Sequence, residues 1–191
     1  MYHLTTLDVF ESIVVNGLLS RGELLRRNIN FVDTANPDIL LGRERLGLEN
    51  CIPFHFHIYT AYDTEVKRSH NKSFIYLCLS REYAENHGFK ILPLHPTALE
   101  QPQLFEYSEG FKRIDWEVME MTKEDVNKQG IDERYHKQVR MAECLSPKPI
   151  AICDFQSIAV KDEETKQRVN EILDRHDIII KPYIDIKERD F

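Results

Sequence analysis

The side chains that could do chemistry in this sequence are few and far apart. His3 and Thr5 lie two residues apart in a segment that we expect to be extended, so both could face one pocket. Arg43 carries a planar fork of donors that suits phosphate oxygens. Glu143 stands where a polar stretch gives way to an expected short strand. Taken singly, each of these residues is more often an ordinary structural or surface side chain.

The local motifs of several large enzyme classes are absent. The sequence contains no GxxxxGK(S/T), GxGxxG, HExxH or GxSxG. It therefore lacks the usual signatures of P-loop phosphoryl transfer, dinucleotide-dependent hydride transfer, zinc proteolysis and serine hydrolysis. A catalytic site in this chain has to be assembled from residues that are distant in the sequence.

Metal binding has little support. His55 and His57 lie two apart on an expected strand and could face one side, but no third ligand follows at a suitable spacing. The four cysteines are widely spaced and form no CxxC pair (Cys51, Cys78, Cys144 and Cys153). We therefore expect no metal and buried free thiols.

Length and composition indicate one globular domain over residues 1–191. The chain is 42% hydrophobic and 30% charged, which is close to ordinary soluble proteins. It has no apolar run of the ~18 residues that a membrane span requires, and its first residues do not resemble a secretory signal. We expect a cytoplasmic protein with no membrane contact.

The charge distribution is uneven. A net charge of −7 argues against binding nucleic acid by bulk electrostatics. Basic residues nevertheless gather in three parts of the sequence, namely Arg21, Arg26, Arg27, Arg43 and Arg45, then Lys67, Arg68 and Lys72, then Arg134, Lys137 and Arg140. They could form a local basic face on an acidic body, or be scattered solvated charges.

Helices and short strands are mixed in the expected secondary structure. We expect a helix between Thr6 and Gly17, an irregular segment over 22–49, helical structure over 116–140 and a helix that Asp162 caps. Expected strands are 52–59, 73–79, 89–94, 143–145, 150–152, 157–160 and 178–180. The absence of a regular strand-helix alternation favours an α+β fold.

Four segments, taken in order, resemble the DarT family. They are His3-Leu4-Thr5 with 10–18, Asn36-Pro37 through Arg43 with 52–56, Ile114-Asp115-Trp116, and 140–145 with the strand and helix after it. The second includes Pro53-Phe54-His55-Phe56, which is similar to the Pro-Phe-x-Phe strand of that family. Together the four segments span nearly the whole chain, and their order makes the resemblance fairly specific.

The resemblance implies a single-domain ADP-ribosyltransferase-like fold, in which helices flank a central split antiparallel sheet. It also implies an NAD-dependent toxin that transfers ADP-ribose to a base in single-stranded DNA and releases nicotinamide. NAD is then a co-substrate, and a cognate antitoxin protein is the expected partner. Breaking the nicotinamide–ribose bond passes through an oxocarbenium-like transition state, beside which a carboxylate is useful.

Site residues follow from the same resemblance. It implies that Glu143 is the catalytic glutamate and that Arg43 pairs with phosphate, with Arg45 as the alternative arginine. His3 and Thr5 would bind NAD. The resemblance also places nicotinamide near the strand that carries Phe54, which could stack on the ring or pack in the core.

The acceptor side is expected to involve Trp116, Arg134 and Arg140. An aromatic side chain can stack on an unpaired base, and basic side chains can contact the backbone. Trp116 could instead be a packing residue. The alternatives for the whole chain are modification of single-stranded RNA, a binding module without turnover, and transfer to a protein acceptor.

Overall fold

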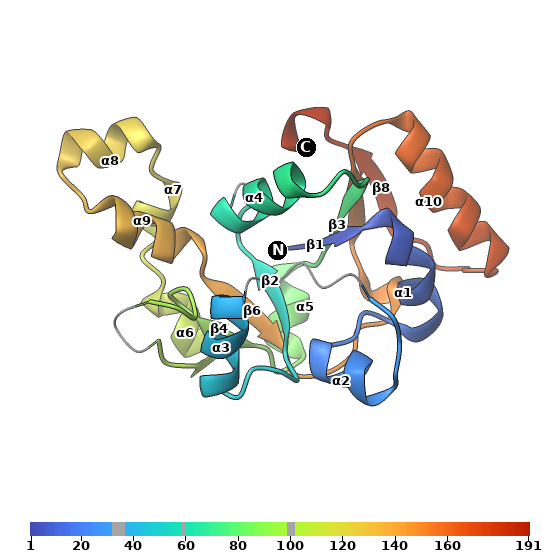
Figure 1. Cartoon of the computed structure of the whole chain (residues 1–191), viewed down its shortest axis with the longest axis horizontal. Coiled ribbons are helices and arrows are strands. Elements are labelled where there is room, and N and C mark those ends of the chain that lie inside the picture. Colours follow the sequence, from blue (N-terminus) through green and yellow to red (C-terminus); the bar gives the residue numbers. More distant parts are fainter. Residues whose placement is uncertain (32–36, 59, 99–101) are drawn as a thin grey trace.

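The computed structural model describes residues 1–31, 37–58, 60–98 and 102–191. Across these residues the strands form one sheet in the order β5-β4-β6-β2-β1-β3-β7-β8 (Figure 1). The strands are β1 (Tyr2–Thr6), β2 (Ile52–His55), β3 (Phe74–Cys78), β4 (Lys90–Leu92), β5 (Phe105–Glu106), β6 (Glu143–Ser146), β7 (Ser157–Val160) and β8 (Tyr183–Ile186). Asn36 and Tyr59, which belong to segments discussed above, lie outside the described residues.

The sheet is split between β1 and β2. These two strands pair antiparallel through a single residue pair, Tyr2 with His55. On either side the pairing is complete, since all five residues of β1 pair with β3 and all four residues of β2 pair with β6. Beyond Tyr2 the two strands therefore separate and leave an opening in the middle of the sheet.

The expected antiparallel arrangement holds for every named strand pair except one. β7 and β8 run parallel, because α10 (Glu163–Arg175) carries the chain back before β8 begins, as a parallel connection requires. The mixed α/β architecture that we expected is confirmed.

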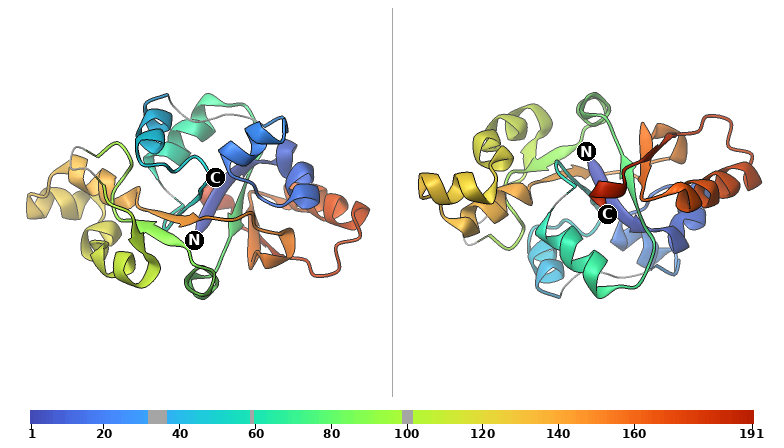
Figure 2. Two further views of the ribbon diagram at one scale, coloured as in Figure 1. Left: turned by 90° about the horizontal axis from the view of Figure 1, so that it is seen from below. Right: turned by 90° about the horizontal axis from the view of Figure 1, so that it is seen from above.

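Helices surround the sheet unevenly. They are α1 (Phe10–Asn16), α2 (Arg21–Arg26), α3 (Pro37–Arg45), α4 (Ala61–Ser69), α5 (Arg81–Asn86), α6 (Tyr107–Arg113), α7 (Trp116–Glu120), α8 (Lys123–Gln129), α9 (Glu133–Arg140) and α10, with 3-10 turns at Leu7–Val9, Ile152–Asp154 and Glu188–Asp190. Figure 2 shows α3 and α4 on one side of the sheet and α5 on the other, while α8 and α10 lie at opposite ends of the molecule.

Side-chain caps explain where many of these helices begin. Ser20, Thr60, Ser80 and Asp162 each accept a hydrogen bond from the backbone N–H three residues later, which satisfies one of the free donors at a helix start. The Asp162 cap was expected from the sequence. The helix that begins after Thr60 was not, although its cap was readable.

Three secondary-structure predictions were wrong. Residues 22–49 contain α3 and all of α2 except Arg21. The sequence gives no clear helical pattern for α3, because this helix fully buries only Gly42 and has no continuous apolar stripe. Residues 178–180 are no strand, since Ile179 is 95% exposed and β8 begins later. Of residues 150–152, only Ile150 makes a bridge, with Leu18. Apolar β-branched residues form a strand only where a partner edge is free.

The main core lies on one face of the sheet under the flanking helices, and two smaller buried clusters, around Leu92 and Tyr76, lie on the other face. Fully buried side chains from distant elements meet in the main core, among them Phe10, Phe54, Leu77, Ile91 and Val139. This packing fixes β2 and β6 against each other, and with them the residues that border the opening.

We expect Gly17→Ala to lower the free energy of unfolding by about 1–3 kcal/mol. Gly17 ends α1 with φ of 77°, and a Cβ there would lie 2.9 Å from the carbonyl oxygen of Ile150. Urea unfolding followed by circular dichroism measures the effect. Val15→Ala, on the exposed face of the same helix, is the control and should change stability by less than about 0.5 kcal/mol. Equal stabilities would contradict this close approach.

Candidate active site

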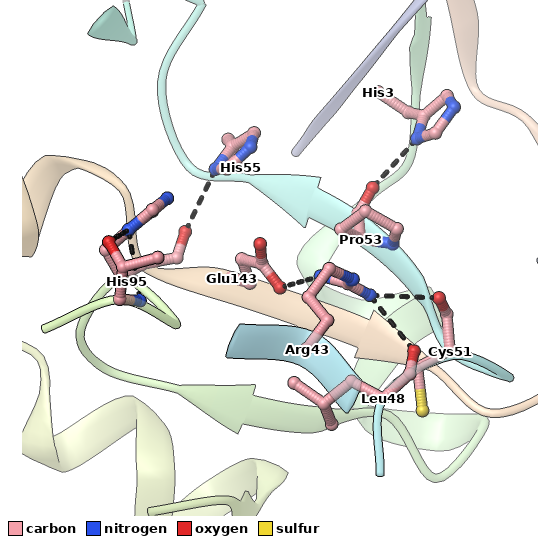
Figure 3. A network of polar contacts seen from close by, with 10 residues as sticks. His3, Arg43, Leu48, Cys51, Pro53, His55, His95 and Glu143 are labelled. Carbon is pink, nitrogen blue, oxygen red and sulfur yellow. Dashed lines mark hydrogen bonds and ion pairs between the residues drawn. The ribbon is translucent and has the colours of Figure 1, made fainter. Parts of the chain in front are cut away.

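A cleft of about 460 Å³ lies at the opening between β1 and β2. Side chains from several separate parts of the sequence border it, including His3 and Thr5 of β1, Arg43 of α3, His55 of β2 and Glu143 of β6. Figure 3 shows Arg43 and Glu143 pointing toward each other beside His55. The volume falls in the range of about 300–1,000 Å³ that is usual for small-molecule sites.

Arg43 and Glu143 form a nearly buried ion pair. Nη1 of Arg43 donates to Oε2 of Glu143 at 2.5 Å, and the two side chains are 11% and 5% exposed. Nη2 of Arg43 donates to the carbonyl oxygens of Leu48 and Cys51 at 3.2 and 3.1 Å (Figure 3). The guanidinium is therefore held from two sides, and it holds the carboxylate in one orientation.

The sheet and α3 position this pair. Glu143 begins β6, where it is paired with His55 of β2 on one side and with Leu92 of β4 on the other. Gly42 lets α3 approach the chain at Pro96, since a Cβ at residue 42 would lie 3.1 Å from the Pro96 carbonyl oxygen. The helix thus presents Arg43 to a strand that comes 100 residues later.

His3 contributes a neutral ring to the cleft. Its Nδ1 lies 2.8 Å from the carbonyl oxygen of Pro53, and because a carbonyl can only accept, Nδ1 carries the proton. Burial, with the nearby Arg43 and His55 as smaller causes, lowers the pKa of His3 to about 4. The hydrogen bond to Pro53 opposes this change. At neutral pH the ring therefore offers its Nε2 as a hydrogen-bond acceptor.

His3 and Glu143 come from opposite faces of the pleated sheet. Tyr2, His55 and Glu143 are consecutive cross-strand partners and share one face, so His3, next to Tyr2, faces the other way. Both nevertheless border one cleft, because β1 and β2 separate after their single pair. The split is what brings these two side chains to a common space.

The other expected cofactor residues differ in position. Thr5 borders the cleft. Arg45 is exposed and lies outside the residues that line it. Phe54 is fully buried, with its ring 5.6 Å from the His3 ring and 6.1 Å from that of Phe89. The expected stacking of Phe54 on nicotinamide disagrees with this position, because β2 turns Phe54 into the core and its neighbours Pro53 and His55 to the cleft.

Trp116 packs inside the protein instead of lining the cleft. Its ring centroid lies 4.6 Å from that of Phe111 and 5.3 Å from that of Phe56. Its Nε1 donates to the Phe111 carbonyl oxygen at 2.9 Å, and the Arg81 guanidinium lies 4.9 Å from its ring. These contacts correspond to the packing alternative for Trp116, and they tie α6 and α7 to the end of β2.

The two expected basic residues of α9 lie away from the cleft. Arg134 is exposed at the start of the helix. Arg140 borders a separate groove of about 570 Å³ between α4, α8 and α9, together with Arg68, Lys123 and Lys137. The Nε atom of Arg140 is buried, and the described part of the chain offers it no hydrogen-bond partner.

Sequence reasoning missed several polar cleft residues, among them Tyr62, Asp63 and His95. Burial lowers the pKa of His95, and the Glu143 carboxylate opposes this. No motif in the sequence marks His95. Asp63 could have been found through Thr60, which caps its helix by accepting from the Asp63 N–H at 3.0 Å.

The described residues contain no candidate metal cluster and no candidate membrane span. No group of three or more His, Cys, Asp or Glu there could hold a metal ion. His55 borders the cleft. His57 is not among the residues that line it, and its Nε2 lies 3.7 Å from Oε1 of Glu120. None of the helices in the described ranges has the length and apolarity needed to cross a membrane.

Comparisons with known proteins agree on one family. A family model described as ssDNA thymidine ADP-ribosyltransferase, DarT, matches residues 2–189. Similar solved structures include Thermus sp. 2.9 DarT in complex with carba-NAD+ (17% identity, 100% of this chain and 96% of that chain, TM-score 0.77) and with ADP-ribosylated ssDNA (18%, 100% and 94%, 0.79). Thermosipho africanus DarTG in complex with ADP-ribose is also similar (19%, 100% and 50%, 0.69). A search of curated proteins gave no match.

We expect the His3 ring to stay neutral from pH 8 to about pH 5, with its proton on Nδ1. The unfolded chain takes up this proton near pH 6.5 and the folded protein only near pH 4. His3 therefore contributes stability that is present above pH 6.5 and is lost as the pH falls through this window. Nuclear magnetic resonance titration of the ring measures the pKa. In addition, His3→Gln should lose less stability than the parent between pH 7 and pH 4.5. A ring midpoint near pH 6.5 would contradict the assignment.

Proposed function

The chain belongs to the DarT family of single-stranded DNA thymidine ADP-ribosyltransferases, and we propose that the cleft between β1 and β2 is its NAD site. Its activity is NAD-dependent transfer of ADP-ribose to single-stranded DNA. The observation that carries the site assignment is the 2.5 Å contact between Arg43 and Glu143 in a cleft that His3 also borders. We propose further that residues 1–191 act as one transferase domain.

Glu143 is the proposed catalytic residue. The C1′–N bond between ribose and nicotinamide breaks, and nicotinamide leaves with the bonding electron pair. The resulting oxocarbenium-like ribose carries positive charge that a carboxylate within reach stabilises. An atom of the acceptor base then forms a bond to C1′ and loses its proton, which the Glu143 carboxylate accepts.

Arg43 has a double role in this proposal. A guanidinium has five N–H donors, and three are used in the contacts to Glu143, Leu48 and Cys51. The two that remain can donate to a pyrophosphate oxygen of NAD. Arg43 thus positions Glu143 and also neutralises phosphate charge near it. Its position on the cleft, in contrast to exposed Arg45, favours Arg43 as the functional arginine.

His3 and Thr5 would hold the sugars or amide of NAD. Nε2 of His3 can accept a hydrogen bond, and NAD offers hydroxyl and amide donors. The Thr5 hydroxyl can donate or accept. A neutral His3 adds no positive charge that would compete with Arg43 for the phosphates.

On the acceptor side, we propose that Arg140 and Arg134 contact the backbone of the DNA strand. Arg140 precedes Glu143 by three residues and borders a groove with four Lys and Arg side chains and two glutamates. Such contacts give a sequence-independent, salt-dependent affinity. The packing of Trp116 against Phe56 and Phe111 favours a structural role for this residue.

We also propose that the chain is a cytoplasmic toxin controlled by an antitoxin protein that removes or blocks the mark. Support comes from the similarity to Thermosipho africanus DarTG, of whose chain the match covers 50%. Co-purification with proteins encoded beside this chain tests for such a partner.

Incubation with labelled NAD and matched single-stranded DNA and RNA oligonucleotides tests the function directly. We expect label on DNA in the parent protein, and a loss of about 100-fold or more in Glu143→Gln, because the amide cannot accept the proton. Label on RNA alone would show that the acceptor is RNA and not DNA. Label that stays with protein after nuclease treatment would indicate a protein acceptor, and no label at all would contradict a catalytic role.

Arg43→Gln and Arg45→Gln form a matched pair. We expect Arg43→Gln to reduce transfer by about 100-fold or more and to destabilise the protein by about 3–5 kcal/mol, because the buried Glu143 loses its counter-charge. Arg45→Gln should change transfer by less than about 2-fold, as expected for an exposed side chain. The same assay and urea unfolding measure both effects. Equal activity losses in the two variants would remove the distinction between the arginines.

A further inference from the structure

Asp63 is a cleft residue to which the proposed mechanism gives no task. It lies in the first turn of α4, is 2% exposed and borders the same cleft as Glu143 and His55. A carboxyl group at such a place loses its hydration and needs hydrogen-bond partners. The contacts around it reveal its protonation state.

The hydroxyl of Tyr76 has one proton, and three of its contacts bear on where that proton lies. The hydroxyl oxygen lies 2.8 Å from the carbonyl oxygen of Ile58, 3.2 Å from Oδ2 of Asp63 and 3.2 Å from Nζ of Lys67. Ile58 can only accept and Lys67 can only donate. A carboxylate at Asp63 would have to share the Tyr76 proton with Ile58. A proton on Oδ2 of Asp63 lets Tyr76 donate to Ile58 and accept from both Lys67 and Asp63, so that all three contacts are satisfied.

Burial favours this neutral form. Desolvation is the largest effect on Asp63 and raises its pKa. The nearby His55 and Lys67 and the hydrogen bonds with Thr60 and Tyr76 offset it only in part. Geometry and solvation thus both favour the protonated form of this carboxyl group.

The second oxygen of Asp63 is left without a partner. Oδ1 is buried and has no hydrogen-bond partner in the described ranges of the chain. In a carboxyl group whose proton is on Oδ2, Oδ1 is a carbonyl oxygen and can only accept. A buried acceptor without a donor costs about 1–3 kcal/mol, and a bound ligand with an N–H group would satisfy it.

We propose that Asp63, as a neutral carboxyl group, accepts a hydrogen bond from a planar amide-type N–H of a bound substrate. This inference rests on the proposed function, which brings one such donor, the carboxamide N–H of NAD, into the cleft. Thymine in a DNA strand has a single ring N–H, and that proton is the one that the base loses to Glu143. Asp63 is then a specificity-determining residue that stands on α4, opposite the sheet that carries Glu143.

Asp63→Asn and Asp63→Leu separate this role from others. Asn is a close mimic of the neutral acid, since its NH2 group can donate to Tyr76 and its carbonyl oxygen replaces Oδ1. We expect Asp63→Asn to keep transfer within about 3-fold, and Asp63→Leu to lower kcat/KM by roughly 10-fold or more. Thermal unfolding of both variants shows whether they are folded, and only folded protein is assayed.

The assay measures KM for labelled NAD and, separately, for a thymidine-containing single-stranded oligonucleotide. A raised KM for NAD in Asp63→Leu would identify the carboxamide as the donor, and a raised KM for the oligonucleotide alone would overturn the inference. Unchanged kinetics in folded Asp63→Leu would overturn the inference, as would an equal loss in Asp63→Asn, which would indicate a charged Asp63. An inactive parent protein would instead contradict the proposed function.

Discussion

The site depends on one buried ion pair. Glu143 is held on a central strand of the sheet, where an uncompensated carboxylate would be costly. Arg43 supplies the opposite charge from a helix that lies 100 residues earlier, and backbone carbonyls of the segment between α3 and β2 hold its other end. The contact between Arg43 and Glu143 therefore links the packing of α3 against the sheet to the orientation of the carboxylate.

That pair would have no substrate-sized space beside it if the sheet were continuous. β1 and β2 share one residue pair and then diverge, and the His3 ring bonds to Pro53 across the gap. The opening gives side chains from both sheet faces access to a single cleft. The His3 ring in this cleft is neutral at neutral pH, and the charges of Arg43 and Glu143 are paired with each other. A preorganised site of this kind needs little rearrangement when charge develops in the transition state.

Helices α6, α7 and α9 lie next to the ends of β2 and β6. An aromatic cluster of Phe56, Phe111 and Trp116 ties α6 and α7 to the end of β2. α9 then leads directly into Glu143 and carries Arg140 to a groove with other basic residues. The net charge of −7 belongs to the whole chain, whereas this groove gathers four Lys and Arg side chains with two glutamates.

The sequence by itself determined the α+β class, most core strands and the family resemblance, because apolar alternation, helix caps and short motifs are local properties. It also singled out Glu143, Arg43, His3 and Thr5, which the structure brings to one cleft. Only the tertiary structure placed Arg43 on the cleft and Arg45 outside its lining, turned Phe54 into the core and added Asp63 and His95 to the cleft. The reason is physical, since a side chain's burial, its partners and its protonation depend on which distant segments pack around it, and no local pattern encodes where a sheet opens.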